Sequence, residues 1–345
     1  MPIIEYTPDL FEALQEMVVQ VPRNMNLGHR PFVDYYYATR NTCKLYLFFS
    51  DSGKVLGTIG SELLRFELNS QEITIRIGSN WFSLHRGIGG QLSSHSAMRN
   101  PNAYGMVFIA SHRALNVLRH TSWFPVAGLK GYFLNACSLR PWNSWWKSAA
   151  NLVVRQFAGR RIGALAARIP DEIASTVQVE EEFAYTPDML PRSSRFSFRF
   201  APTAEYLAWR YNLSLAFVRY RLFRVLAAGR SVGYVILNDS PEQTIVAQCD
   251  AEDAMMLSYG VLLAILEAGK NYQATRGVFL SSCHPEMSAV FEAFGFRRWM
   301  RPDLPFGFRN VPPGLNLRAT SNWLINYDWS DNGLQAPFLD QTDHP

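Results

Sequence analysis

The sequence has few cysteines and no two of them close together. Cys43, Cys137, Cys249 and Cys283 are its four cysteines, and no Cys-x-x-Cys motif occurs. This spacing argues against a structural zinc site and against a dithiol redox motif. Free, buried thiols in a reducing compartment explain the wide spacing of the cysteines. We therefore expect a cytoplasmic protein that needs no metal. Cys283 is followed by His284, but adjacency in the sequence does not make a catalytic pair.

The sequence also lacks a long apolar run and a strong excess of one charge. No stretch approaches the roughly 20 apolar residues that a transmembrane helix needs, and Met1–Glu5 does not have the pattern of a signal peptide. The formal net charge is +4, and Lys and Arg form no stripe with aromatic residues, so nucleic acid is not an expected partner. The mild positive charge suits a small anionic ligand. With 48% hydrophobic and 18% charged residues, the composition is that of a globular protein.

A chain of 345 residues is long enough for two domains. The expected elements occur twice in the same order, which is a strand hairpin, a strand, a helix, a buried strand and a second helix. In the first half they are expected at 44–65, 73–77, 91–99, 104–110 and 113–120, and in the second half at 219–238, 243–250, 255–268, 277–281 and 285–294. Such a repeat indicates two copies of one fold rather than a solenoid.

The most informative stretch is a glycine-rich turn between a strand and a helix. The strand Ile73–Ile77 alternates apolar and polar residues, and the turn reads Leu84-His85-Arg86-Gly87-Ile88-Gly89-Gly90. Three glycines in four residues let the backbone approach a ligand closely. Amides at the start of a helix are a ready site for an anion. Because many such turns are only structural, the order of the elements around it must carry the interpretation.

In that order of elements, the stretch resembles the GNAT family of acyl-CoA-dependent N-acyltransferases. The family carries Q/R-x-x-G-x-G/A between its fourth strand and the next helix, and Leu84–Gly89 matches the two glycines, with Leu84 in place of Gln or Arg. A second family signature is a helix of the form N-x-x-A-x-x-L-Y that ends in a Gly-Phe pair. Its places are taken here by Ser111, Ala114, Val117, Leu118, Ser122 and Trp123. Leu118 stands where many members have the tyrosine that protonates the leaving thiolate.

The resemblance implies a mixed α/β (α+β) fold with two GNAT-like domains in tandem, each a mostly antiparallel sheet flanked by helices. Residues 1–140 would be the N-terminal domain, which binds acetyl-CoA or another acyl-CoA as co-substrate. Residues 141–190 would be a linker, and residues 191–345 a C-terminal domain with a degenerate CoA site. The pyrophosphate is expected on the amides of Arg86, Gly87, Ile88, Gly89 and Gly90. The thioester is expected beside the strand at Asn80, Trp81 and Phe82.

The second half departs from the family at the turn. Its ending, Gly295-Phe296, is closer to the family than Ser122-Trp123 is, but Ala251-Glu252-Asp253-Ala254 replaces the glycine turn. Two acids at this place would repel a pyrophosphate. Phe291 stands where the tyrosine would be. We therefore expect the second copy not to bind CoA in the usual way.

Several residues are candidates for proton transfer. Glu62 and Glu72 lie on or near the strands, and a buried carboxylate can act as a general base. His85 in the turn and His95 in the helix after it are alternative bases, and Tyr132 is a candidate proton donor. Solvated glutamates and a core aromatic are the structural alternatives, and the sequence does not choose between them. The run Asp34–Tyr37 likewise either lines an acceptor cleft or packs its tyrosines on the sheet.

The expected linker is rich in tryptophan and basic residues. Trp142, Trp145 and Trp146 lie within five residues, and the helix expected at 152–169 carries four arginines, Arg155, Arg160, Arg161 and Arg168. We interpret it as a connector packed between domains. A helix lying on a membrane surface and a docking surface for an acidic acyl carrier protein are the alternatives.

The sequence thus predicts an N-acyltransferase that moves an acyl group, expected to be acetyl, from acyl-CoA to a primary amine of a small molecule. Transfer would occur by direct attack in a ternary complex. A non-catalytic acyl-CoA-binding or scaffold protein is the first alternative, which Leu84 and the missing tyrosine favour. The second is an acyltransferase that takes its acyl group from an acyl carrier protein or an aminoacyl donor. The acceptor, the acyl length and the formation of a homodimer stay open.

Overall fold

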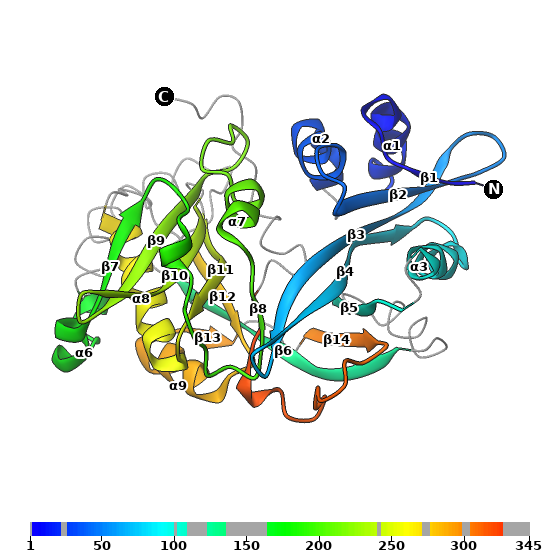
Figure 1. The fold of residues 1–345 in the computed structure, drawn as a ribbon. Helices are drawn as coiled ribbons and strands as arrows, with labels where there is room; N and C mark the ends of the chain where they lie inside the picture. Colours follow the sequence, from blue (N-terminus) through cyan, green and yellow to red (C-terminus); the bar gives the residue numbers. More distant parts are fainter. Residues whose placement is uncertain are drawn as a thin grey trace. The chain divides into compact units, whose positions relative to one another are not determined.

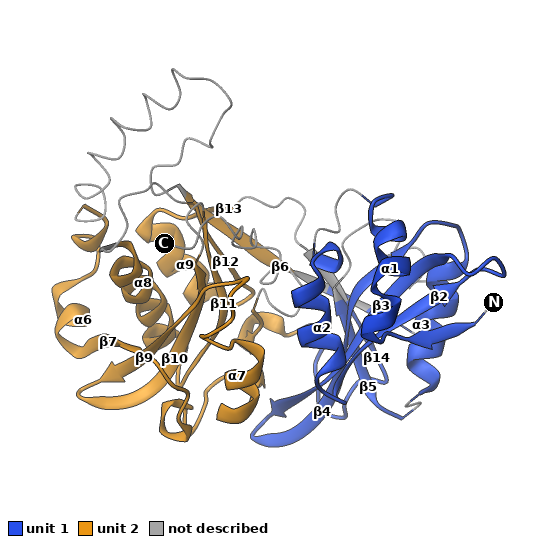
Figure 2. Cartoon of the chain, turned by 90° about the horizontal axis from the view of Figure 1, so that it is seen from above, with its two compact units in different colours: residues 1–128, 304–318, 329–331 blue, residues 129–303, 319–328, 332–345 orange. Residues whose placement is uncertain are grey.

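The computed structural model describes residues 2–21, 26–99, 102–108, 123–135, 164–239, 243–270, 277–298 and 304–326. They form two compact units (Figure 2). The first comprises the described parts of Met1–Gly128 and Leu304–Arg318, and the second those of Leu129–Asp303 and Ala319–Asp328. The expected helix at 113–120, the three clustered tryptophans and most of the basic helix at 152–169 lie outside the described residues.

The first unit is built on a sheet in which only one neighbouring pair is parallel. Its strands lie in the order β1 (Ile3–Glu5), β2 (Cys43–Phe49), β3 (Val55–Leu68), β4 (Gln71–Ser83), β5 (Tyr104–Phe108) and β14 (Leu304–Arg309) (Figure 1). Strands β4 and β5 are parallel. The β3–β4 hairpin turns at Asn69 and Ser70, which both have positive φ (48° and 65°). That is the geometry of a tight hairpin turn whose twist matches that of the strands.

Helices cover both faces of this sheet. They are α1 (Phe11–Val18), α2 (Arg30–Ala38) and α3 (Ile88–Met98). On one face Ile88 and Leu92 of α3 pack on Tyr46, Phe48 and Ile59. On the other face a Cβ added at Gly60 would lie 3.1 Å from the hydroxyl of Tyr37 in α2. Tyr37 therefore packs on the sheet, and Tyr36 is also buried, whereas Tyr35 is half-exposed.

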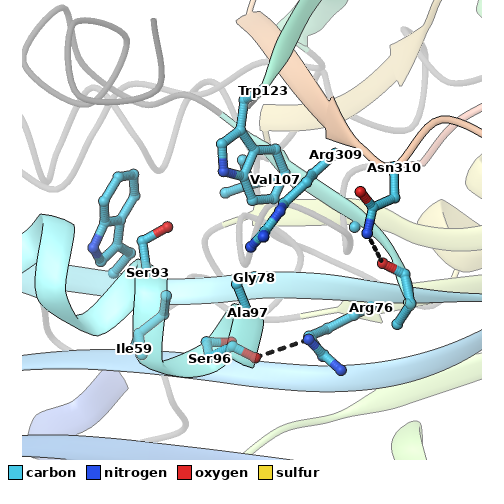
Figure 3. A pocket seen from close by; sticks show the side chains of 13 residues that line it. Ile59, Arg76, Gly78, Ser93, Ser96, Ala97, Val107, Trp123, Arg309 and Asn310 are labelled. Atoms are coloured by element: carbon cyan, nitrogen blue, oxygen red, sulfur yellow. Dashed lines mark hydrogen bonds between the residues drawn. The ribbon is translucent and has the colours of Figure 1, made fainter. Parts of the chain in front are cut away.

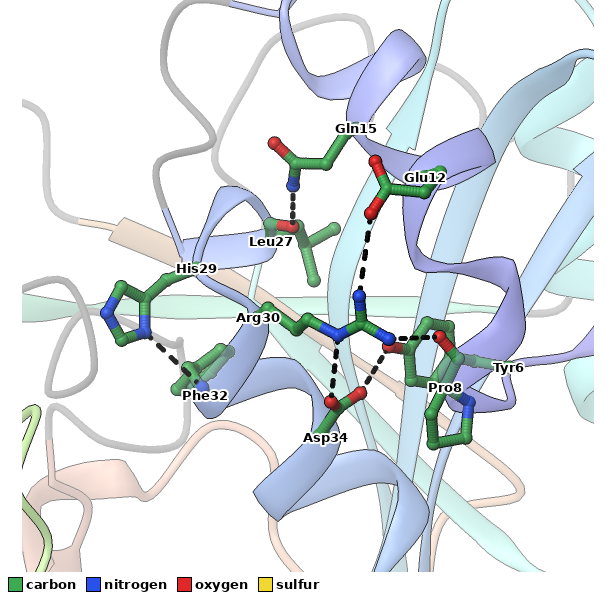
Figure 4. A network of polar contacts seen from close by, with 9 residues as sticks. All are labelled: Tyr6, Pro8, Glu12, Gln15, Leu27, His29, Arg30, Phe32 and Asp34. Carbon is green, nitrogen blue, oxygen red and sulfur yellow. Dashed lines mark hydrogen bonds and ion pairs between the residues drawn. The ribbon is translucent and has the colours of Figure 1, made fainter.

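A polar network ties α2 to the end of β1 (Figure 4). The Tyr6 hydroxyl donates to Asp34 Oδ1 at 2.5 Å, and Arg30 lies 3.4 Å from Asp34 Oδ2 and 3.5 Å from Glu12 Oε1. Burial, and next the bond to Asp34, raise the pKa of Tyr6. Because Arg30 and Glu12 are exposed, their ion pair contributes little stability. The network's main effect is to fix where α2 starts.

The second unit has the same arrangement of sheet and helices. Its strands lie in the order β6 (Phe124–Asn135), β12 (Gly277–Ser282), β11 (Gln243–Ala251), β10 (Arg230–Asp239), β9 (Tyr220–Ala227) and β7 (Val177–Glu182), with β13 (Arg297–Arg298) also on β6. Only β11 and β12 are parallel in this series. Helices α8 (Ala254–Lys270) and α9 (Pro285–Phe294) supply much of a large apolar core, to which Leu257, Val261, Met287 and Phe291 belong. Smaller elements are α6 (Asp171–Thr176), α7 (Ala204–Arg210), β8 (Phe198–Phe200) and β15 (Trp323–Leu324).

The fold class expected from the sequence is confirmed, since two mixed sheets flanked by helices are present. The extent of the units differs from the expected division at 140 and 190. Strand β14, from the tail that we expected to be loop, completes the first sheet by pairing with β5, and β6 pairs with β12 in the second unit. Strand β7 lies inside the expected linker but joins the second sheet, where Arg221 pairs with Glu181 at 2.6 Å. Of the helices in the described part of the chain, none is long and apolar enough to cross a membrane.

Candidate functional site

The glycine turn leads from β4 into α3, as the sequence predicts. Gly87 is the N-cap of α3, and its φ of 91° lies in the left-handed region that favours glycine. No side chain caps this helix start. On β3, a Cβ at Gly57 would lie 2.8 Å from the Phe82 carbonyl oxygen and 2.9 Å from Ile88 Cγ2. Glycine at position 57 therefore lets the first turn of α3 lie directly against the strand.

The start of α3 is uncovered. A Cβ added at Gly87 or at Gly90 would have no heavy atom within 4 Å, and the first turn of α3 contains no acidic residue. Arg86 is exposed beside it. Trp81 Nε1 donates to the Gly89 carbonyl at 3.0 Å and holds the turn against β4. Free amides at a helix start, next to a cation and without a carboxylate, make a site suited to a phosphate group.

Strand β4 carries a bulge just before this turn. In its pairing with β3, Thr58 lies opposite Phe82 and Gly60 opposite Ser79, so that Ile59 faces two residues, Asn80 and Trp81. Asn80 has a φ of 45°. Its carbonyl accepts from Thr58 Oγ1 at 2.8 Å and its Nδ2 donates to the Tyr37 hydroxyl at 2.6 Å. These contacts hold the bulge from both sides.

Beyond the bulge, one edge of β4 has no partner strand within the described residues. The parallel pairing with β5 covers Ile75–Gly78 and Tyr104–Val107, whereas β4 continues to Ser83. The predicted Asn80, Trp81 and Phe82 lie in this part of β4. The structure thus brings the predicted donor residues of the strand and of the turn together at one end of β4.

The two candidate glutamates have different surroundings. Glu62 is only 6% exposed. It lies two residues from Gly60 on β3, so it points to the same face as Gly60, towards α2 and Tyr37. Glu72 is at the far end of β4, where its side chain is 60% exposed and its Oε2 lies 3.0 Å from Arg65 Nε. Of these two carboxylates, only Glu62 is buried.

The candidate histidines and Tyr132 are not gathered around one point. His85 is exposed in the turn. His95, on α3, packs edge-to-face on Tyr46 at 5.2 Å, and burial followed by the charge of Arg99 lowers its pKa. Tyr132 is fully buried in the core of the second unit, where its hydroxyl donates to Glu292 Oε1 at 3.2 Å. Burial raises the pKa of Tyr132, and it packs there as a core aromatic.

The corresponding junction of the second unit is closed. Asp253 Oδ1 accepts from the Met256 amide at 2.9 Å and so caps the start of α8. Glu252 accepts from Arg230 at 2.6 and 2.7 Å, and these hydrogen bonds lower the pKa of Glu252. The two acids that were expected to repel a pyrophosphate are therefore also engaged in capping and pairing.

The chain itself fills the space beyond the β11–β12 pairing. These strands pair over Gln243–Ile245 and Gly277–Phe279 only. Further along, Asn326 Nδ2 donates to Gln248 Oε1 at 2.9 Å and to the Cys249 carbonyl at 3.1 Å. Cys283 Sγ, just after β12, donates to the Trp323 carbonyl at 3.2 Å. Residues 323–326 are all at most 3% exposed. The tail carries no local sequence signal for this role.

The described cysteines form no site. Cys43, Cys249 and Cys283 are free thiols. Burial raises the pKa of Cys249, and it raises the pKa of Cys283 to about 12, so neither is a thiolate at neutral pH. Burial lowers the pKa of His284. Within the described residues, no group of three or more His, Cys, Asp or Glu is arranged to hold a metal ion.

Comparisons with known proteins were made at the level of sequence and of structure. No protein-family model and no curated protein matches the sequence. Among solved structures, a tandem GNAT protein from the clavulanic acid biosynthesis pathway has a TM-score of 0.55 at 11% identity, over 90% of this chain and 99% of that chain. A GCN5-related N-acetyltransferase from Anabaena variabilis has a TM-score of 0.54 at 9% identity, over 90% and 73% of the two chains. One from Kribbella flavida has a TM-score of 0.50 at 14% identity, over 92% and 74%.

Because the sequence identities are this low, the comparisons show the fold alone. They extend over both units, and the glycine turn and the order of elements agree with the resemblance deduced from the sequence. The chain has the tandem GNAT fold.

Proposed function

We propose that the chain is an acyl-CoA-dependent N-acyltransferase whose donor binds to the first unit. The observation that carries the proposal is the start of α3, which has no side-chain cap and no acidic residue in its first turn, beside the part of β4 that extends past its pairing with β5. The amides of Gly87–Gly90 and the Arg86 guanidinium supply hydrogen bonds and charge for a pyrophosphate. The structures with similar folds include N-acetyltransferases, which supports this donor class.

The chemistry follows from the groups at the bulge. The acceptor ammonium must first lose a proton, and we assign that step to Glu62 as the buried carboxylate on the α2 face. The amine lone pair then attacks the thioester carbonyl carbon, whose oxygen is held by an amide of the β4 edge at Asn80–Phe82. The C–S bond breaks as the amide forms, and the nitrogen releases its second proton, which the CoA thiolate takes up. This balance requires no oxidant, reductant or metal.

We infer that the second unit does not bind a donor. Asp253 caps the start of α8, Glu252 adds negative charge there, and Trp323–Asn326 occupies the space next to β11. An acyl-CoA would have to displace a buried, hydrogen-bonded segment of the chain. The proposal therefore expects one equivalent of acyl-CoA per chain.

Substitution at Gly90 tests the donor site most cleanly. Gly87 is unsuitable because its positive φ would strain any other residue, and a Cβ at Gly89 would lie 3.4 Å from both Ser83 Oγ and Trp81 Nε1. A Cβ at Gly90 meets open space. Gly90→Asp places a carboxylate where the phosphates would lie, and it also suits a helix start. We expect acyl-CoA affinity to fall by about tenfold or more without loss of stability.

Gly90→Ala is the matched control. It should raise helix stability by about 0.5–1 kcal/mol and leave acyl-CoA binding intact. Isothermal titration of the full chain with acetyl-CoA and with desulfo-CoA gives stoichiometry and affinity, and urea unfolding gives stability. Equal affinity of wild type and Gly90→Asp for acetyl-CoA, or no binding by either, would contradict the donor site.

Turnover with a panel of primary amines distinguishes an enzyme from a non-catalytic acyl-CoA binder. One equivalent of bound acetyl-CoA without amine-dependent release of free thiol would favour the binder. If neither acetyl-CoA nor a longer acyl-CoA binds, a salt-sensitive complex with an acyl carrier protein becomes the next measurement.

A further inference from the structure

The first unit contains a small cavity on the α3 face of its sheet, separate from the glycine turn. It is bounded by β4, β5, the second half of α3 and β14. Among its lining residues are Arg76, Ser93, Ser96, Trp123, Arg309 and Asn310 (Figure 3). None of Leu84–Gly90 lines it, so it does not include the surface at which we place the donor phosphates. It shares Trp81 with the part of β4 at which we place the thioester.

Two arginines from distant parts of the sequence meet in this cavity. Arg76, on β4, is 8% exposed, and its Nη1 donates to the Ser96 carbonyl at 2.8 Å. Arg309, on β14, extends into the cavity from the opposite wall (Figure 3). Burial lowers the pKa of Arg76, and the charge of Arg309 lowers it further, whereas Tyr46 raises it. Both arginines therefore line the same cavity.

The cavity wall offers cations and donors but no acid. No Asp or Glu is among the described residues that line it. Arginine side chains in the wall of a cavity suit a negatively charged ligand. Strand β14 pairs with β5 in the first sheet, and this pairing brings Arg309 to the cavity that Arg76 lines. A strand pairing that links residues more than 200 positions apart thus creates this concentration of positive charge.

We propose that this cavity is a binding site for a small oxyanion, such as a carboxylate or a phosphate group. Guanidinium groups pair with both through two parallel hydrogen bonds. The buried Ser93 and Ser96 line the same wall and can supply hydroxyl donors. The cavity volume of about 40 Å³ is room for roughly three water-sized groups. It accommodates one anionic head group and excludes an intact nucleotide.

Arg309→Gln tests the site without disturbing the buried Arg76. Inorganic phosphate and succinate are the probes, in isothermal titration and thermal unfolding of the full chain at low salt. We expect saturable binding to wild type, weakened about tenfold or more by Arg309→Gln and retained in part by Arg309→Lys. Arg65→Gln is the matched control, because Arg65 is exposed on β3 and pairs with Glu72. It removes the same charge and should leave binding unchanged.

A second variant keeps both arginines and removes the space. Ala97, on α3, lines the cavity, and leucine there is compatible with a helix. Ala97→Leu should therefore abolish binding of phosphate and succinate. Equal affinity of wild type, Arg309→Gln and Ala97→Leu for both probes overturns the proposal, as does the absence of saturable binding to wild type.

The source of the anion is a separate arm of the same experiment. If the anion is the end of a donor's acyl group, succinyl-CoA binds more tightly than acetyl-CoA and Arg309→Gln removes that difference. If it is a free anion, phosphate binds equally well when acetyl-CoA saturates the chain. Gly90→Asp should keep phosphate binding in the cavity while losing acetyl-CoA. Failure of this proposal and failure of the proposed function are therefore distinguishable.

Discussion

Glu62 and Glu72 have the same side chain on neighbouring strands, but the fold gives them opposite surroundings. Glu62 is buried, on the face that also carries Tyr37 and the side chain of Asn80. Glu72 is solvated and paired with Arg65 at the end of β4 away from the glycine turn. A base needs to reach a bound substrate. At the residue scale, Glu62 is therefore the better candidate.

Glu62→Gln tests this assignment. It keeps the size of the side chain and removes its capacity to take up a proton. We expect kcat/KM for an amine acceptor to fall by about 10²–10⁴-fold, with acetyl-CoA affinity unchanged. Initial rates of thiol release as a function of pH are the measurement. Glu72→Gln is the matched control and should keep full activity, and an active Glu62→Gln would remove Glu62 from the mechanism.

The placement of the candidate donor residues could be predicted from the sequence. The glycine turn, Arg86 and the strand residues Asn80–Phe82 lie together because they are close in sequence, on one strand and the helix after it. The surroundings of Tyr132 could not be predicted in this way. Whether an aromatic on a strand faces a substrate or a core depends on which sheet the strand joins, and β6 pairs with β12 of the second unit. No local pattern carries that information.

At the scale of elements, the same strand-to-helix junction occurs twice with opposite outcomes. The start of α3 is left open by Gly87 and Gly90, whereas Asp253 caps α8 with its own carboxylate. The second junction is also backed by Trp323–Asn326. The junction at which we propose that an anion binds in one unit is thus closed in the other.

Asn326 is the residue on which the filling segment depends most. It is 3% exposed and joins β11 through Gln248 and Cys249. Asn326→Ala leaves the Gln248 amide oxygen and the Cys249 carbonyl without this donor in a dry place. We expect the free energy of unfolding to fall by about 3 kcal/mol, measured by urea unfolding. Asn322→Ala, at an exposed position in the same segment, should change it by less than about 0.5 kcal/mol.

Acyl-CoA binding separates this effect from a role in the donor site. Because we place the donor on the first unit, Asn326→Ala should still bind one equivalent of acetyl-CoA. A second equivalent in this variant would mean that the segment covers a working site. A stability loss similar to that of Asn322→Ala would instead show that the segment is not held by its asparagine.

Most elements followed from the sequence because their signals are local. Helix α9 (Pro285–Phe294) begins at a proline and ends at Gly295, whose φ of 119° is left-handed, as a helix-ending glycine should be. The hairpins β3–β4 and β9–β10 followed from alternation and turn residues. The pairing of β14 with β5 and the pairing of β6 with β12 did not follow from the sequence. Which distant strand completes a sheet edge is set by the packing of the whole unit, and a short apolar run can serve at any edge.

At the scale of the whole molecule, burial of histidine links stability to pH. The pKa values of His29, His95 and His284 are all lowered, with burial as the largest cause. Arg99 adds to the lowering at His95, and Glu286 opposes it at His284. The unfolded chain, with pKa values near 6.5, therefore binds more protons than the folded chain just below that pH. Stability is complete above the unfolded pKa and is lost as the pH falls towards the folded values.

We expect the urea midpoint to fall as the pH is lowered from about 7.5 to 5.5, a range above the titration of most carboxylates. His95→Gln should make this fall shallower, because Nε2 of His95 is buried without a hydrogen-bond partner and a proton there would be unfavourable. His85→Gln, in the exposed turn, is the matched control and should follow the wild-type slope. A midpoint that rises on acidification would mean that the histidines gain negative partners on folding. That result would contradict the partly buried, neutral state deduced for all three.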